Sequence, residues 1–595
     1  MSAGTSSARW PSRLSTAIVF GLWALLVVHA IDFVVAYASP IPLWDDLALV
    51  RWVPGELPID LVNLWDQHNE HRIPLAKLIA ILLVRGAEDF RAPMLLSVLM
   101  LATTALVALL AVRRRRGSTR LSDAIFPLVW LHTGHGANLI MGFQIALVLP
   151  MMLVTLAALL LAREGPLGSR RIALVGAIAL TLPLNGGAGA MHAIVWCVVL
   201  GLLGARELRR ARRGPGVTAL AFALVTAALV AVYLVGLEQR EQLASGLPRA
   251  DDLGSQVATA LRFLSLSVGP AGAELAWGGA AALAGALGTL VVLARGAFAE
   301  DGRPSTWAPG IALVGGVLTT AAAIGWSRGG AELGGYAQRY VVLAAPLATG
   351  LALAWDTNRS AHTARVGRGL LALALLVALV PNHRAGSWIG VYRRELHQTL
   401  TSDVERGFST AQLAREHWRD CSARSSFFAE QLATLRAHRW PPYERAEGPD
   451  TPLAGARPRF PMFVTAPDRI EPDGSHYKRR IHQRSALLTA GGTRLVYALT
   501  PQHRLLRGGY GVPPGAWETG TVETVTVTVS IEANGERTPL LVRELVPGTT
   551  PEDRGIQPFE IELPRGLPRG AELVLSTDEQ PSGVVWSFWC DLELE

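Results

Sequence analysis

Cysteine is scarce in this chain of 595 residues: only Cys197, Cys421 and Cys590 are present. Their spacing is not that of a metal site or of a disulfide framework, which excludes a small disulfide-stapled scaffold and a cysteine-bound metal centre. Cys197 lies in an apolar run. Cys421 and Cys590 both fall in the part that we expect outside the cytoplasm, where one disulfide between them is an option.

Charged residues are also few, at 17%, whereas half of the residues are hydrophobic. The net charge of +7 is carried almost wholly by arginine, and the arginines cluster in alternate short loops between apolar runs, at residues 113–116, 206–213 and 359–368. This is the composition of a membrane protein, and arginine-rich loops are typical of the cytoplasmic side. The basic charge is therefore a topology signal and does not indicate a nucleic-acid partner.

Apolar runs long enough to cross a bilayer recur over residues 15–381. Arg9 and Arg13 precede the first run, which places the N-terminus in the cytoplasm and the next loop outside. This run lacks a small-residue cleavage site, so we interpret it as a retained anchor. A short apolar helix at the interface is expected over residues 73–84. Eleven crossings are expected, over residues 15–37, 92–112, 121–131, 139–162, 172–184, 188–203, 217–236, 273–293, 308–326, 340–355 and 369–381.

An odd number of crossings places the C-terminal part of the chain outside the cytoplasm, and its composition is polar. Residues 391–450 have helical character, which Pro441 and Pro442 interrupt. Residues 451–595 contain short β-rich runs between turns, most clearly TVTVTVSIEANGE at 524–536, which alternates with period two before a turn. We predict a polytopic α-helical membrane domain at 1–390, a helical linker at 391–450 and a C-terminal extracytoplasmic β-sandwich at 451–595.

The polar insertion at residues 38–77 is the best candidate for a functional site. It carries the adjacent acids Asp45 and Asp46 behind Trp44, and about twenty residues later the run Asp-Gln-His-Asn-Glu-His-Arg at 66–72. Carboxylates, imidazoles and a guanidinium are costly beside a membrane unless they bind or react with something. Other outer turns add His132, His135, Gln144, Arg328, Tyr336, Arg339 and Tyr340 as candidates.

Each of these assignments has a structural alternative. Asp45 and Asp46 after a span can cap the next helix, the 66–72 run can be a hydrogen-bonded loop, and outer arginines can anchor spans at the headgroups. His68 and His71 are spaced like a zinc pair, but no third ligand has suitable spacing. The cofactor is therefore left unknown, with a divalent cation at the two acids as an alternative.

An acidic pair directly after the first span of a multi-spanning protein resembles the GT-C type glycosyltransferases. The resemblance covers about residues 15–390 and rests on topology, on WDD at 44–46, WDQHNEHR at 65–72, GFQ at 142–144 and QRY at 338–340. It implies an enzyme of the bacterial inner membrane that transfers a sugar from a polyprenyl-phosphate carrier to a glycan, lipid or protein acceptor at the outer face.

The resemblance also implies roles for individual residues. Asp45 or Asp46 would be the base for the acceptor, and the other acid would hold a metal or a hydrogen bond. Cations would bind the phosphate of the carrier. The phosphate candidates are Arg72, Arg328 and Arg339; the remaining substrate-binding candidates are His68, Asn69, Glu70, His71, His132, His135, Gln144, Tyr336 and Tyr340.

Two other classes of function fit the same sequence. A transporter or flippase of a lipid-linked or anionic substrate has similar spans, but such proteins usually place their sites near the membrane midplane and contain internal repeats, which are not visible here. A membrane-anchored carbohydrate-binding protein would use the β-sandwich, and leaves residues 38–77 without a role.

Overall fold

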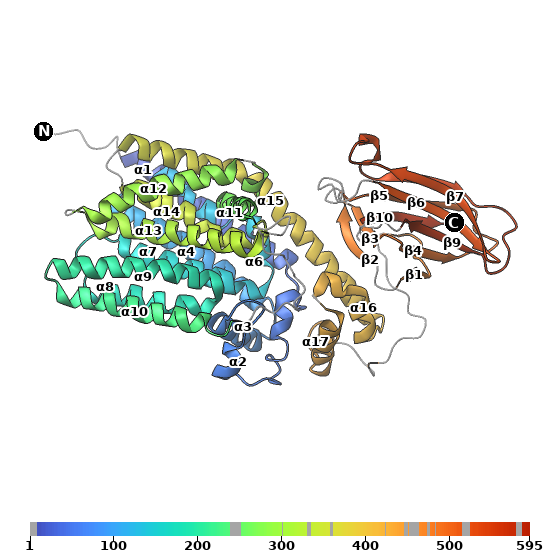
Figure 1. Ribbon diagram of the computed structural model, residues 1–595, viewed down its shortest axis with the longest axis horizontal. Helices are drawn as coiled ribbons and strands as arrows, with labels where there is room; N and C mark the ends of the chain where they lie inside the picture. Colours follow the sequence, from blue (N-terminus) through green and yellow to red (C-terminus); the bar gives the residue numbers. More distant parts are fainter. Residues whose placement is uncertain are drawn as a thin grey trace. The chain divides into compact units, whose positions relative to one another are not determined.

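The computed structural model divides the chain into two compact units, Met1–Glu395 and Leu396–Glu595, which are described separately (Figure 1). The described residues are 9–237, 252–275, 277–299, 302–329, 335–357, 361–422, 424–444, 450, 463–472, 476–481, 484–513, 524–578 and 586–595. Most of the outer loop expected before residue 252, and the start of the expected β region at 451–462, lie outside these ranges.

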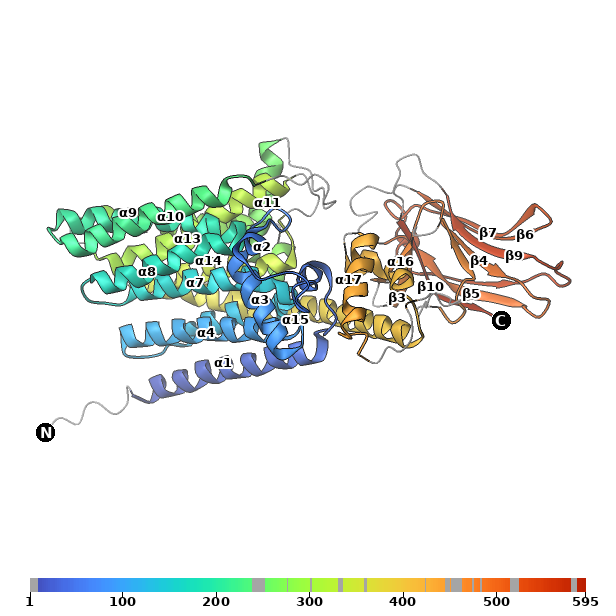
Figure 2. The ribbon, with the colours of Figure 1, turned by 90° about the horizontal axis from the view of Figure 1, so that it is seen from below.

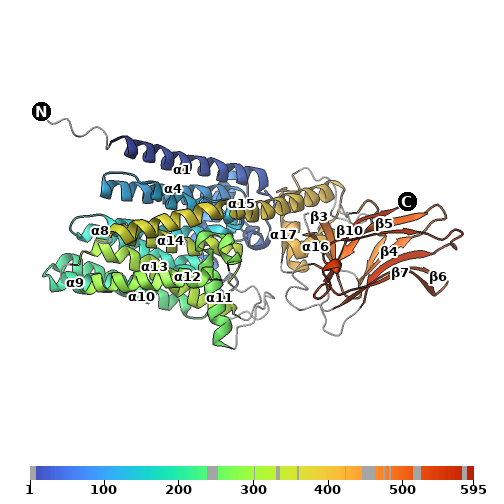
Figure 3. The same ribbon diagram turned by 90° about the horizontal axis from the view of Figure 1, so that it is seen from above.

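The first unit consists of long helices that lie side by side, with shorter helices between them (Figures 1 and 3). The long helices are α1 (Arg9–Tyr37), α4 (Ala92–Arg116), α7 (Ile145–Ala162), α9 (Gly186–Arg209), α10 (Arg213–Leu234), α12 (Gly278–Phe298), α13 (Pro304–Arg328), α14 (Val341–Thr357) and α15 (Ala361–Glu405). The shorter ones are α2 (Leu61–Trp65), α3 (Pro74–Ala87), α5 (Ile125–Trp130), α6 (Gly136–Leu139), α8 (Ser169–Thr181) and α11 (Leu253–Ser265).

Nine helical segments in the described residues are long and apolar enough to cross a membrane, where the sequence predicts eleven crossings. The difference arises at two short apolar runs. Residues 121–131 form a 3-10 turn and the six-residue helix α5, which rises only about 9 Å against a hydrocarbon thickness of about 30 Å. Residues 172–184 lie in α8, which joins α9 in one 41-residue segment, Ser169–Arg209, with a turn at Gly186 (φ +89°).

Buried ion pairs connect α4, α14 and α15 at the arginine-rich ends of these helices. Arg116 Nη2 lies 2.6 Å from Asp123 Oδ1, and Arg368 pairs with both Asp123 and Asp356. Each of these side chains is 10% exposed or less. Arg368, which the sequence places in a basic loop, is therefore a structural cation inside the bundle.

The second unit contains α16 (Thr410–Cys421), α17 (Ser425–Ala437) and two five-stranded antiparallel sheets. One sheet has the order β1 (Arg469–Glu471), β4 (Arg494–Ala498), β9 (Glu572–Thr577), β6 (Val525–Ala533), β7 (Glu536–Leu545). The other has the order β2 (His476–Ile481), β3 (Arg484–Ala490), β10 (Trp586–Leu594), β5 (Leu505–Gly511), β8 (Gln557–Glu562).

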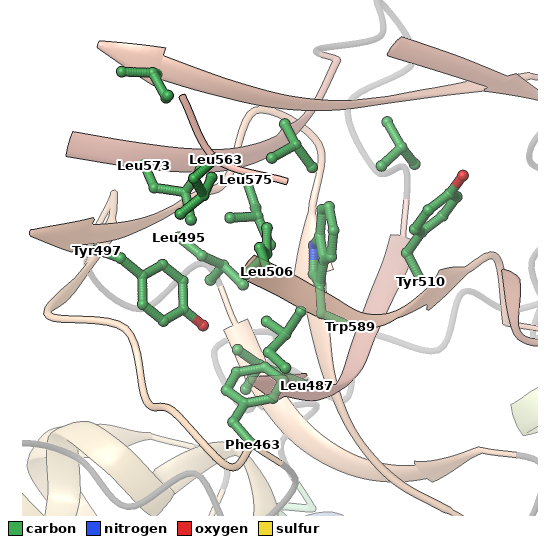
Figure 4. Packing of buried hydrophobic residues seen from close by; sticks show 14 of the residues in the cluster. Phe463, Leu487, Leu495, Tyr497, Leu506, Tyr510, Leu563, Leu573, Leu575 and Trp589 are labelled. Atoms are coloured by element: carbon green, nitrogen blue, oxygen red, sulfur yellow. The ribbon is translucent and has the colours of Figure 1, made fainter. Parts of the chain in front are cut away.

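The hydrophobic core of this unit draws side chains from both sheets (Figure 4). Tyr497 and Leu575 belong to one sheet, and Trp589 to the other. The predicted hairpin is confirmed: β6 buries alternate residues, and Asn534 and Gly535, both with positive φ, turn the chain into β7. This geometry is that of the two-residue hairpin turn for which Asn-Gly is the preferred sequence.

The disulfide considered between Cys421 and Cys590 is not formed in this structure. Cys421 is buried at the end of α16, and Cys590 packs on β10 against Leu488 and Phe588. The domain boundary expected at residue 390 lies inside the continuous helix α15.

Candidate functional site

Asp45 and Asp46 lie in a short 3-10 helix, Trp44–Leu49, that follows the first long helix. Trp44 has a left-handed backbone (φ +53°), a rare conformation for a bulky residue and one that is often found at functional sites. The two carboxylates then diverge. Asp46 is 3% exposed, whereas the side chain of Asp45 is 26% exposed.

Asp46 caps a helix in the interior of the unit. Its carboxylate accepts hydrogen bonds from the backbone N–H groups of Phe143 at 2.6 Å and Gly142 at 3.3 Å. These groups begin the turn Gly142–Gln144 that leads into α7, where a carboxylate satisfies unpaired N–H donors. Burial raises the pKa of Asp46 to about 7, although these hydrogen bonds and the charge of Arg393 oppose the rise. Asp46 therefore connects the loop to the start of α7, about a hundred residues away, whereas the capping alternative placed it on the next helix of the chain.

We expect Asp46→Asn to weaken the pH dependence of stability. Between its ordinary pKa of 3.8 and about 7 the folded protein keeps a proton that the unfolded chain releases, so stability falls as pH rises through this window. The full shift corresponds to roughly 4 kcal/mol. Thermal unfolding of the detergent-solubilised protein from pH 5 to 8 should show a falling midpoint for the parent chain and a flatter profile for the variant. Parallel profiles would contradict the assignment.

Asp45 faces a group of polar side chains from distant segments. Its Oδ1 lies 3.3 Å from His68 Nε2 and 3.4 Å from Asn69 Nδ2, and its Oδ2 lies 4.0 Å from Arg339 Nη1. Burial by itself raises the pKa of Asp45, but the hydrogen bond and charge of His68, with the charge of Arg339, lower it below its ordinary value. Asp45 is thus an ionised, partly exposed carboxylate at neutral pH.

A tight turn carries the partners of Asp45. His68 and His71 exchange backbone hydrogen bonds of 2.7 and 2.9 Å, and Asn69 between them has a left-handed φ of +49°. The His68 ring packs on Phe143 with 4.5 Å between ring centroids. Phe143 therefore both donates to Asp46 and supports the imidazole beside Asp45, so one residue of the GFQ segment orders both sides of the acidic pair.

The side chains of Glu70 and His71, in the same turn, contact α13 and α9. Glu70 Oε1 accepts a hydrogen bond from Arg328 Nη2 at 3.1 Å, so the loop is paired to the end of α13. The ring of His71 lies over the backbone of Gly187, where an added Cβ would come within 3.1 Å of it. The glycine-bearing turn before α9 thus leaves the space that this histidine occupies.

The guanidinium of Arg72 donates its hydrogen bonds to backbone carbonyls and not to Asp45 or Asp46. Its Nη1 donates to the carbonyls of Tyr233 at 2.9 Å and Val235 at 2.7 Å, and its Nη2 donates to that of Gly236 at 2.9 Å. These carbonyls lie at the C-terminal end of α10, where they lack helical partners. Arg72 also stacks on Trp65 at 5.6 Å. These contacts give Arg72 a structural role, and its expected phosphate contact stays a prediction.

His132, His135 and Gln144 are inside the helical unit, with at most 3% exposure. The two imidazole rings are tilted by 31° with their centroids 4.6 Å apart, and His135 Nε2 donates to the carbonyl of Val129 at 2.9 Å. Burial lowers the pKa of His135 to about 4 and that of His132 well below its ordinary value, so both are neutral. In the described residues none of the three bonds to Asp45. The same outer turn contributes through Asn138, which donates to the carbonyl of Arg339 at 2.9 Å.

Tyr340 and Tyr336 flank Arg339 in the chain. The guanidinium of Arg339 lies 5.7 Å from the Tyr340 ring centroid, and Phe263 packs edge-on against that ring. Tyr336 is half-buried; burial and the nearby charge of Glu274 raise its pKa. Asn138 binds the backbone of Arg339, and Tyr340 lies beside its side chain. These contacts keep Arg339 near Asp45, although 44% of its side chain is exposed.

Arg393 is a candidate that the sequence did not reveal. It lies on α15, is 8% exposed, and makes no hydrogen bond or ion pair among the described residues, although its charge acts on Asp46. On the same helix Gly386 packs on Thr133 and Gly390 packs on Tyr37. Residues 386, 390 and 393 lie on one helical face. The sequence does not reveal this face as part of a site, because the change to polar composition predicts a linker from residue 391.

Among the described residues, no group of three or more His, Cys, Asp or Glu side chains is placed to bind a metal ion. The side chains around Asp45 and Asp46 therefore do not form such a group. The two oxygens of Asp46 are both turned to backbone N–H groups.

No protein-family model matches this chain, and a search of curated proteins finds no relative.

Proposed function

We propose that the protein is a membrane glycosyltransferase that moves a sugar from a polyprenyl-phosphate carrier to a cell-envelope acceptor at the outer face of the inner membrane. The observation that supports this best is Asp45: an ionised carboxylate, partly exposed, held by His68 and Asn69 with the guanidinium of Arg339 beside it. A base and a cation adjacent to apolar spans are the two groups that this reaction needs.

In the proposed reaction Asp45 takes the proton of the acceptor hydroxyl as its oxygen attacks the anomeric carbon of the sugar. The bond between that carbon and the carrier's phosphate oxygen breaks, and the electron pair leaves with the phosphate. Arg339 and Arg393 stabilise the charge that develops on the departing phosphate, since guanidinium groups bind phosphate oxygens strongly. One displacement with a single base inverts the configuration at the sugar.

In this proposal the two C-terminal sheets form a β-sandwich on the outer side, after an odd number of crossings. The transporter and carbohydrate-binding alternatives require none of the contacts around Asp45, which is why we favour the enzyme.

The test is a transfer assay with the full-length protein in lipid nanodiscs. A panel of polyprenyl-phosphate sugars is supplied with envelope glycans, lipids and peptides as acceptors, and both glycosylated product and freed polyprenyl phosphate are measured. We expect one donor to release its phosphate in step with product formation. Donor binding or movement across vesicles without release of the phosphate would instead support the transporter.

A further inference from the structure

The short helix α2 exposes two apolar side chains more fully than any other large hydrophobic residue in the described part of the chain. Leu61 is 85% exposed and Val62 is 81% exposed, whereas Leu64 in the same helix is 7% exposed. The helix is well formed, because Asp60 caps it by accepting from the backbone N–H of Asn63 at 2.8 Å. A rigid helix that turns adjacent apolar side chains away from its own protein indicates a surface that something apolar covers.

The contacts of α2 place it beside the end of a spanning helix (Figure 2). Trp65, its last residue, stacks on Arg72, and Arg72 is hydrogen-bonded to the carbonyls at the end of α10. The helix α10 is long and apolar enough to cross the membrane. It carries exposed apolar side chains along its length and just beyond its end: Leu224 (73%), Val225 (52%), Val232 (54%), Leu234 (50%) and Val235 (73%). The end of α2 therefore lies next to the end of a helix whose exposed apolar side chains suit a lipid environment.

We propose that α2 is an interfacial anchor that inserts Leu61 and Val62 among the acyl chains of the leaflet at this end of the bundle. Interfacial helices bury an apolar face at the boundary between headgroups and acyl chains and keep polar residues at the water side. Asp60 and Asn63, which flank the apolar pair, suit that boundary. The occupant is lipid, and its source is the membrane that α10 is long and apolar enough to cross.

This anchor has a consequence for the site, which rests on the proposed function. The chain runs from α2 directly into residues 66–72, which carry His68 and Asn69 to Asp45. An anchored α2 holds this segment at the level of the lipid headgroups, where the phosphate of a lipid-linked donor lies.

The experiment measures the surroundings of α2 and needs no substrate, so its failure and that of the proposed function are distinguishable. Val62→Cys is labelled with a nitroxide in full-length protein whose three natural cysteines are replaced by alanine, in nanodiscs of phosphatidylethanolamine and phosphatidylglycerol. Collision rates with oxygen, which concentrates in lipid, and with a water-soluble nickel chelate are compared. Leu224→Cys on α10 is the lipid reference, and Glu552→Cys, on an exposed position of the second unit, is the water reference.

We expect the label at position 62 to favour oxygen over nickel, as at position 224, and the label at position 61 to repeat the result. A nickel-dominated profile like that at position 552 would mean that α2 faces water and would overturn the proposal. An immobilised label that neither reagent reaches would also overturn it, because a protein surface, such as a second copy, would then cover α2. Both positions are highly exposed, so the substitutions should not disturb folding.

Discussion

Asp45→Asn is expected to lower glycosyl transfer by about 10²- to 10⁴-fold, the usual contribution of a positioned general base. Asparagine keeps the shape of the side chain and its hydrogen bonds to His68 and Asn69, but it does not accept the proton of the acceptor hydroxyl. The loss should therefore appear in kcat, with little change in the KM of the donor, in the nanodisc transfer assay with saturating acceptor.

The adjacent acid provides the control for that experiment. Asp46→Asn changes the same functional group one residue away, but Asp46 is directed at the N–H groups of Phe143 and Gly142 and not at the exposed side. It should retain most of the activity while altering the dependence of the unfolding midpoint on pH. If Asp46→Asn is the inactive variant and Asp45→Asn is active, the roles assigned to the two carboxylates are reversed. If both variants keep full activity, neither acid is the base.

The sequence identified the loop of the site but did not distinguish its two acids. A dense polar run beside apolar spans is visible from composition alone. Which acid faces outward depends on the left-handed backbone of Trp44 and on the N–H groups near Phe143, about a hundred residues away. Both depend on tertiary packing, which local patterns do not record.

The contacts of the arginines also depend on tertiary packing, which the local sequence does not record. Arg72 belongs to the same polar run as the histidines. Its guanidinium nevertheless donates hydrogen bonds to the backbone carbonyls at the end of α10, which lack helical partners. Arg393 lies more than three hundred residues from the loop and reaches it only because α15 continues past the end expected for the last span. Cations are common in outer loops, so residue type alone does not tell a phosphate ligand from a helix clamp.

Local signals gave the more reliable predictions. The alternation in residues 524–531 and the Asn-Gly turn after it specify a hairpin from neighbouring residues, and β6 and β7 form it. The expected crossings at residues 121–131 and 172–184 stay predictions, because an apolar run shorter than a bilayer is equally compatible with a buried short helix.

Arg393→Ala is expected to reduce kcat/KM for the lipid-phosphate donor by about 10- to 100-fold, because a hydrogen bond between charged groups contributes roughly 1.5–3 kcal/mol. Arg393 is buried and forms no hydrogen bond among the described residues, and for this reason we assign its N–H donors to the anion. Arg339→Ala should give a loss of similar size, and Arg393→Lys should recover part of the activity by restoring the charge without the guanidinium fork. Initial rates at varied donor concentration measure each effect.

Arg394 supplies the matched control, since it is the same residue type at the next position of α15. Its guanidinium is exposed and stacks on Tyr37 at 5.2 Å. Arg394→Ala should therefore leave kcat/KM for the donor within about twofold of the parent value, as is usual for a substitution at the surface. Equal losses at 393 and 394 would indicate damage to α15, and would remove Arg393 from the site. A loss at 393 alone, with an unchanged unfolding midpoint, is what a phosphate ligand requires, because only the anion-bound state would then be affected.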